Sequence, residues 1–193
     1  MDASWLDVLL SACLGLALAA ACGFRIFVPP LVLSAAAMLG RVELTPGLAW
    51  LGTWPALTAL AIAVVAEIGA YYVPWLDNLL DALGAPLAVG AGILLVAAPL
   101  VEVGPVTRWT LAILAGGAAA GGVHVALALV RKASSLATGG LANHLLATGE
   151  AVTSLSLAVL AVALPLLALL CVVLAVAFAR RLARRRPLQT VEG

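Results

Sequence analysis

The stretch "ACGFRIFVPP", residues 21–30, places an arginine and a double proline inside a run of sequence that is otherwise apolar. Arg25 is the only charged residue between Asp7 and Arg41. How this part of the chain folds depends on whether the surrounding run lies in water or in lipid, because an ionisable side chain in lipid is costly unless it is paired.

Composition and hydropathy place the chain in lipid. Of its 193 residues, 65% are apolar and 10% are charged, and the mean hydropathy is +1.20. An ordinary soluble domain is about 45–50% apolar and about 25% charged. A membrane helix needs roughly 20 residues, and the long stretches without Asp, Glu, Lys or Arg are 8–24, 44–66, 82–101, 109–130 and 151–179. They lack the alternation of membrane strands, so we predict an all-α, polytopic helical membrane protein with about five transmembrane helices.

The first apolar run is too long for one span. A helix over residues 8–40 would be about 50 Å long at 1.5 Å per residue, against a hydrocarbon core about 30 Å thick. Pro29 and Pro30 each remove a backbone donor, which predicts a break at residues 28–31 and a short re-entrant or tilted segment over residues 31–40. Such a break must be covered by protein or face a water-filled cavity.

Two further segments depart from a simple span. Residues 151–179 are longer than one crossing needs, and Pro165 is expected to kink them. The stretch "PWLDNLLDAL", residues 74–83, is typical of a short interfacial helix, with Asp77 and Asp81 on one polar face.

The two terminal segments differ in charge. No basic residue precedes the first apolar run, so a cleavable signal peptide is not expected. Residues 1–179 form one predicted transmembrane domain, and residues 180–193 form a basic tail that contains five arginines. The positive-inside rule places this tail in the cytoplasm.

Counting backward from the tail over five spans gives a predicted topology with the N-terminus outside a bacterial cytoplasmic membrane. Segments 41–47 and 102–108 are assigned inside, and segments 73–85 and 131–150 outside. Seven of the ten basic residues then lie inside, and two, Arg131 and Lys132, lie outside.

The three cysteines are expected to act as small buried hydrophobic residues. Cys13, Cys22 and Cys171 lie in apolar segments without C-x-x-C spacing. No cofactor and no nucleic-acid partner are expected, and the question of a metal stays open.

Polar residues from several segments are candidates for a binding site. Ionisable groups at membrane depth usually face the bundle interior in pairs. The candidates are Arg25, Glu67, Asp77, Asp81, His124, Lys132, Thr138, Gly139, Gly140, Asn143 and Glu150. Four different segments offer charge at a similar depth toward the outer side, and this convergence predicts the site.

Most candidates also have a structural interpretation. Glu67 can be a boundary residue that touches head groups, and His124 can be a packed histidine that hydrogen-bonds a neighbouring helix. The two aspartates can be only the wet face of an interfacial helix. We expect Arg131 and Lys132 to include one side chain that snorkels to the head groups.

Two environments are open for Arg25. On a straight helix it lies about 25 Å from residue 8 and can snorkel toward the cytoplasmic face. If the helix breaks, the guanidinium lies beside irregular backbone with free carbonyls, and a carboxylate partner such as Glu67 is then needed.

Glycine-containing motifs indicate loops and close helix packing. The stretch "KASSLATGGLAN", residues 132–143, is either an external loop or a loop that dips into the membrane and lines a cavity with its hydroxyl groups. Rows of small residues predict closely packed helices; they are Gly15, Ala19 and Gly23 in the first span, and Gly117 and Gly121 in the fourth apolar stretch.

With these residues in view, the chain resembles a bacterial membrane family catalogued as a domain of unknown function. The resemblance covers roughly residues 8–178, and it rests on "GFRIFVP" at 23–29, Glu67 followed by "PWLDNLLD" at 74–81, and "TGGLAN" at 138–143 with Glu150 seven residues on. It implies that Arg25, Pro29, Glu67, Asp77, Asp81, Thr138, Gly139, Gly140, Asn143 and Glu150 belong to a polar signature. The chain departs from the family pattern at His144, where a proline is expected, and at Ala151, where an acidic residue is usual.

Three functions are compatible with this pattern. A small transporter or permeation protein is favoured, because broken helices and paired intramembrane charges are what an ion or solute path requires. A second copy of the chain could help to enclose that path. A non-catalytic scaffold or partner subunit is the first alternative, and an enzyme acting on lipid head groups is the second. An enzyme is disfavoured because the sequence lacks G-x-S-x-G, H-E-x-x-H and D-x-x-D motifs.

Overall fold

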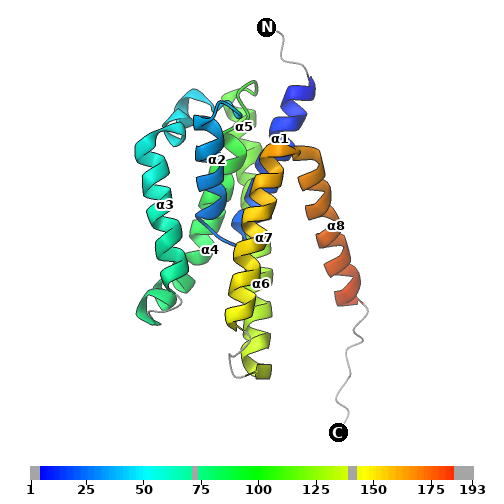
Figure 1. The fold of residues 1–193 in the computed structure, drawn as a ribbon. Coiled ribbons are helices and arrows are strands. Elements are labelled where there is room, and N and C mark those ends of the chain that lie inside the picture. Colours follow the sequence, from blue (N-terminus) through cyan, green and yellow to red (C-terminus); the bar gives the residue numbers. More distant parts are fainter. Residues whose placement is uncertain (1–4, 71–73, 139–142, 185–193) are drawn as a thin grey trace.

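The computed structural model describes residues 5–70, 74–138 and 143–184, and this part of the chain folds as helices joined by short connections. In chain order the elements are α1 Trp5–Cys22, α2 Val28–Met38, η1 Pro46–Gly52, α3 Trp54–Gly69, α4 Pro74–Ala97, α5 Pro105–Leu111, the π-helical turn η3 Ala112–Gly116, α6 Gly117–Thr138, α7 Asn143–Ala163 and α8 Pro165–Arg184 (Figure 1). The all-α prediction is confirmed for the described residues.

Several of these helices are long and apolar enough to cross a bilayer. By length and composition, three stretches qualify within the described residues: Trp5–Cys22, Pro105–Ser134 and Leu145–Ala163. The pair formed by η1 and α3 bends by 64° at its break and makes a fourth if it is counted as one span. The apolar helices indicate a membrane protein, and the count of five spans stays a prediction.

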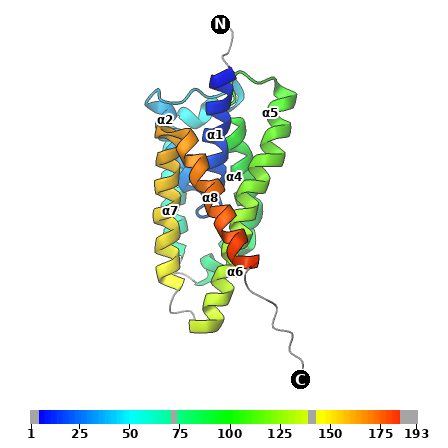
Figure 2. The same cartoon turned by 90° about the vertical axis from the view of Figure 1, so that its right-hand side faces the viewer.

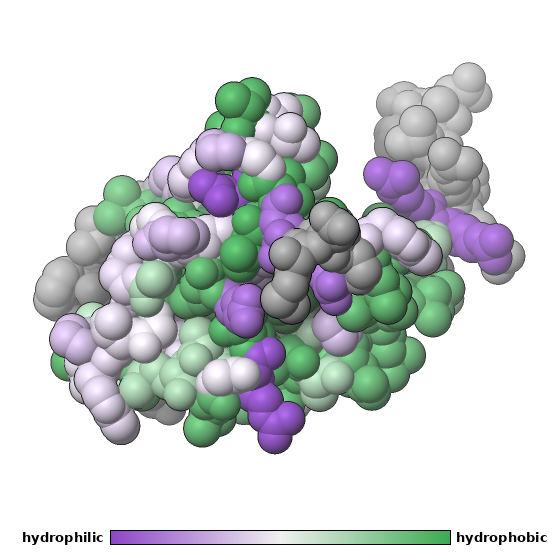
Figure 3. Space-filling view, turned by 90° about the horizontal axis from the view of Figure 1, so that it is seen from above, coloured by the Kyte–Doolittle hydropathy of each residue, from purple (hydrophilic) through white to green (hydrophobic). Residues whose placement is uncertain are grey.

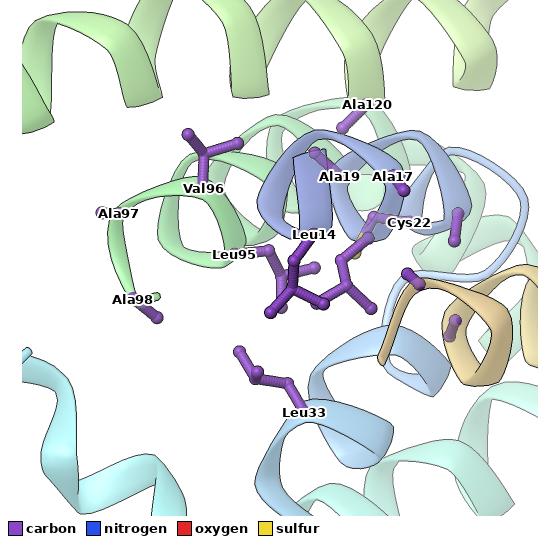
Figure 4. Close-up of a cluster of buried hydrophobic side chains, with 14 of the residues drawn as sticks. Leu14, Ala17, Ala19, Cys22, Leu33, Leu95, Val96, Ala97, Ala98 and Ala120 are labelled. Atoms are coloured by element: carbon purple, nitrogen blue, oxygen red, sulfur yellow. The ribbon is translucent and has the colours of Figure 1, made fainter. Parts of the chain in front are cut away.

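Helix α1 lies at the centre of the bundle and packs against α4, α6, α7 and α8. The core is built largely from its alanines and small neighbours, with Leu14, Leu33 and Leu95 filling the remaining space (Figure 4). Gly15 allows a close approach, because a Cβ placed there would meet the Val96 Cα of α4 at 2.8 Å. The predicted close packing at small residues is therefore present in the first span.

The break after the first helix lies earlier than the prolines suggested. Helix α1 ends at Cys22 and α2 begins at Val28, so the irregular segment is 23–27 instead of 28–31. Pro29 and Pro30 lie in the first turn of α2, where a missing N–H costs nothing because no partner within the helix exists for it. The prolines therefore begin the second helix and do not end the first.

Helix α2 turns back toward the end of the bundle at which α1 begins (Figure 1). One cavity at that end is lined by the start of α1, by residues 41–43, by residues 99–103 and by Val162 and Pro165. These four segments therefore share one end. The sequence predicted that 41–47 and 102–108 lie on the side opposite the N-terminus. That prediction differs from this arrangement, because the prediction counted the first apolar run as one complete crossing of the membrane.

Three further segment assignments were wrong. Residues 151–179 are not one kinked span: α7 ends at Ala163, α8 begins at Pro165, and α8 turns back alongside the bundle (Figures 1 and 2). Residues 74–83 are the first turns of α4, which continues through Pro86, and not a separate interfacial helix. Residues 132–138 are the last turns of α6 and not a loop.

The surface of the bundle suits a hydrocarbon environment. Helix α8 buries Ala168 against its neighbours and exposes leucine, valine and phenylalanine side chains along its length. On α3, Ile62 and Val65 are likewise exposed. In a bilayer such side chains face lipid tails and carry no penalty.

Candidate polar site at the break between α1 and α2

The irregular segment 23–27 is held by a carboxylate from another helix. Glu67, near the end of α3, accepts hydrogen bonds from the backbone N–H groups of Ile26 at 2.7 Å and Phe27 at 3.2 Å. These donors immediately precede α2, where helix N–H groups lack partners within the helix and the macrodipole favours negative charge. Glu67 therefore caps α2 from outside its own sequence. The Sγ of Cys22 donates to the Ile26 carbonyl at 3.2 Å and closes the turn.

Arg25 points from the break toward α7. Its Nη2 donates to the backbone carbonyl of Ala147 at 2.7 Å, and the side chain is only 4% exposed. The sequence had suggested that Arg25 binds free carbonyls of the break, with a carboxylate such as Glu67 as its partner; the carbonyl that it reaches belongs instead to α7.

An ion pair joins α6 and α7. The Nε of Arg131 donates to Oε1 of Glu150 at 2.9 Å, and the Nη2 of Arg131 donates to the other carboxylate oxygen. Paired contacts of this kind fix both side chains in one plane. Because Arg25 reaches Ala147, three residues before Glu150 on α7, the two arginines and the two glutamates are linked through the break and α7 as one group with no net formal charge.

One face of α7 carries polar contacts to the break, to α6 and to the end of α1. Ala147, Glu150 and Ser154 are spaced i, i+3 and i+7, which places them on one side of a helix, and all three are buried. The Ser154 Oγ donates to the Ala21 carbonyl at 3.0 Å, which also accepts hydrogen bonds from the backbone N–H groups of Phe24 and Arg25 at the end of α1.

The structure brings together three of the predicted site residues. Arg25, Glu67 and Glu150 are all buried and surround the break. His124 is half-buried on α6 and lies against α4, since a Cβ at Gly84 would be 2.9 Å from its Nε2. Lys132 is exposed.

The remaining candidates lie wholly or partly outside the described residues. Asp77 and Asp81 lie on α4, Thr138 ends α6 and Asn143 begins α7, but their side chains are outside the described set. Gly139 and Gly140 lie outside the described residues altogether.

Sequence reasoning missed three contributors. Arg131 was expected to be one of two candidates for snorkelling, yet it pairs with Glu150. The spacing of Glu150 and Ser154, four residues apart, was a usable signal for a shared face. The contact to the backbone carbonyl of Ala147 could not be predicted from the sequence, because it does not depend on the Ala147 side chain.

A cavity of about 430 Å³ opens at the N-terminal end of the bundle. Charged residues from separate segments line it, namely Asp7, Arg41, Glu43 and Glu102. Viewed from this end, hydrophilic side chains gather toward the middle of the face, and much of the surrounding surface is hydrophobic (Figure 3). Among the described residues, no group of three or more His, Cys, Asp or Glu side chains is arranged to hold a metal ion.

Apolar helices around a broken helix pair and a compensated charge group define a polytopic helical membrane protein. The chain belongs to the family described as Domain of unknown function (DUF4126), whose model matches residues 12–185. No curated protein and no solved structure matches the chain.

Proposed function

We propose that this protein is a small transport or permeation protein that handles a small polar solute or ion at the group formed by Arg25, Glu67, Arg131 and Glu150. The observation that carries the proposal is the break at 23–27, where Glu67 reaches backbone N–H groups at 2.7 and 3.2 Å. Non-helical backbone at membrane depth, flanked by half-helices and intramembrane charges, is typical of solute and ion sites in transporters.

The charge distribution supports an orientation for the proposed transporter. The N-terminal end carries Arg41 and Arg108, while Arg131 and Lys132 on α6 and Arg180, Arg181 and Arg184 at the end of α8 belong to the other end. Among the described residues the tally is therefore five basic residues against two. The positive-inside rule then gives an outside N-terminus and a cytoplasmic C-terminus in a bacterial inner membrane. In this orientation α1 and α2 form a re-entrant hairpin that enters from the outside.

The orientation changes the expected depth of the site. Glu67 lies two residues before the end of α3, which runs away from the N-terminal end of the bundle (Figure 1). The proposed site is therefore nearer the cytoplasmic side, whereas the sequence had suggested the outer side.

The test combines ligand binding with flux. Wild type, Glu67→Gln and Glu102→Gln are screened by thermal shift against ions, small anions and polar metabolites from pH 5 to 8, because a ligand at about 100 times its Kd adds roughly 2.7 kcal/mol of stability. We expect one compound to stabilise wild type and Glu102→Gln but not Glu67→Gln. The same compound should cross the membrane of vesicles that contain wild type or Glu102→Gln, and not that of vesicles that contain Glu67→Gln. Normal flux through folded Glu67→Gln would refute the proposal.

A non-catalytic scaffold is the second candidate, and one observation favours it: Arg25, Glu67 and Glu150 each have a partner inside the protein. A scaffold needs no exchange of these partners with a solute. It predicts that Arg25→Gln and Glu67→Gln couple in a stability cycle while no compound in the panel shifts the melting temperature.

A further inference from the structure

A separate cavity of about 510 Å³ lies on the side of the bundle where α3 stands away from α4. These helices follow one another in the chain, yet α3 packs chiefly against α2 and η1 and lies at the edge of the bundle (Figure 1). The resulting groove, called here the α3–α4 groove, is walled by Phe27, Trp50, Leu60, Leu87, Gly90 and Leu94, among others.

The lining decides what kind of ligand the α3–α4 groove can hold. Its residues are aliphatic or aromatic or are glycine or proline, and none carries a charge. A polar solute would lose its hydration there without gaining hydrogen-bond partners from these side chains. An apolar ligand has no such hydration to lose when it enters the groove.

The groove also faces the hydrocarbon region. Its α4 wall lies within the apolar helical stretch Leu83–Ala97, and its α3 wall belongs to the bent candidate span. Leu87 and Trp50 at its edge are 38% and 54% exposed, so the cavity is open to its surroundings. In a bilayer those surroundings are lipid chains, with tryptophan favoured near the head groups.

The volume distinguishes a lipid chain from a helix of a second copy. A helix is about 10 Å across even with modest side chains, so roughly 7 Å of its length would fill 510 Å³. That is little more than one turn. A hydrocarbon chain is much thinner, and a cavity of this size is within the range of about 300–1,000 Å³ seen for small-molecule sites.

We propose that the α3–α4 groove binds one hydrocarbon chain of a membrane lipid. The chain enters sideways between α3 and α4 and lies against the irregular segment 23–27. Ile26 and Phe27 line the groove and donate their backbone N–H groups to Glu67. The bound chain therefore contacts the same segment as the polar site, from its apolar side.

The wild-type protein tests this proposal directly. It is reconstituted in phospholipid vesicles that contain a phospholipid with a photoactivatable diazirine in one acyl chain, irradiated, and mapped by mass spectrometry. We expect labelling of Leu60, Leu87 and Leu94 several-fold above that of Ile62 and Val65, which are exposed on α3. Equal labelling of the two sets would overturn the proposal.

A matched pair of glycine variants sharpens the test. A Cβ at Gly90 or at Gly122 meets no atom within 4 Å, so a side chain can start at either position without a close contact, and leucine is introduced at each. Only Gly90 lines the α3–α4 groove. Gly90→Leu should remove the excess labelling while Gly122→Leu retains it; loss in both variants, or in neither, contradicts a chain bound in the groove. The wild-type map decides the question even if Gly90→Leu does not fold.

Discussion

The carboxylate of Glu67 and the backbone N–H of Ile26 are 2.7 Å apart, although the residues are separated by 41 positions in the sequence. This contact fastens the far end of α3 to the break between α1 and α2. It explains how irregular backbone is kept inside the bundle, since a second N–H, that of Phe27, binds the same carboxylate.

Removal of the Glu67 carboxylate should destabilise the protein in a graded way. Glu67→Ala leaves two buried N–H groups without that acceptor, at about 1–3 kcal/mol each, whereas Glu67→Gln keeps one acceptor oxygen. We expect unfolding free energy to fall in the order wild type, Gln, Ala, measured by denaturation in detergent. An alanine variant as stable as wild type would show that the carboxylate does not hold the break.

The ion pair between Arg131 and Glu150 should appear in a double-mutant cycle. Contacting charged residues usually couple by about 0.5–3 kcal/mol, so Arg131→Met and Glu150→Gln together should cost less than the sum of the single changes. Lys132→Met is the control, because Lys132 is adjacent and exposed and should be additive with Glu150→Gln. If Lys132→Met coupled to Glu150→Gln as strongly as Arg131→Met does, the coupling would reflect the overall charge of the region and not the ion pair.

The sequence predicted the membrane class and a break near Arg25, and it named Arg25, Glu67 and Glu150 as candidates for an interior polar site. These follow from composition and from the cost of placing charge in lipid. The position of the break was mispredicted because proline signals both a helix end and a helix start. In this chain Pro46, Pro55, Pro105 and Pro165 also lie in the first turns of their helices.

The partners within the site could not be predicted from residue types. Arg25 binds the carbonyl of Ala147, and Glu67 binds backbone N–H groups, so neither contact has a recognisable sequence pattern. The direction of α8 could not be predicted either. Leu164 alone separates α8 from α7, and the sequence of an apolar run does not distinguish a kinked helix from a reversal of the chain.

Close packing between α1 and α4 predicts opposite effects of alanine at two glycines. At Gly15 a Cβ would lie 2.8 Å from the Val96 Cα and 3.0 Å from the Leu95 carbonyl oxygen, and overpacking of this kind costs about 1–3 kcal/mol. At Gly122 a Cβ meets no atom within 4 Å, so Gly122→Ala should be neutral or stabilise the helix by up to about 1 kcal/mol. Equal melting temperatures for the two variants would contradict the close approach of α1 and α4.

The hydroxyl of Ser154 should contribute to stability through the end of α1. Its Oγ is fully buried and donates to the Ala21 carbonyl at 3.0 Å, and hydrogen bonds between membrane helices average about 0.6 kcal/mol, with values up to about 1.7. Ser154→Ala should lower the unfolding free energy by an amount at the lower end of this range, because the carbonyl loses this donor but keeps the backbone N–H groups of Phe24 and Arg25. Ser156→Ala, two residues along the same helix at an exposed position, is the matched control and should change little. If both variants lose the same stability in denaturation experiments, the loss reflects serine in this helix generally and not the contact with α1.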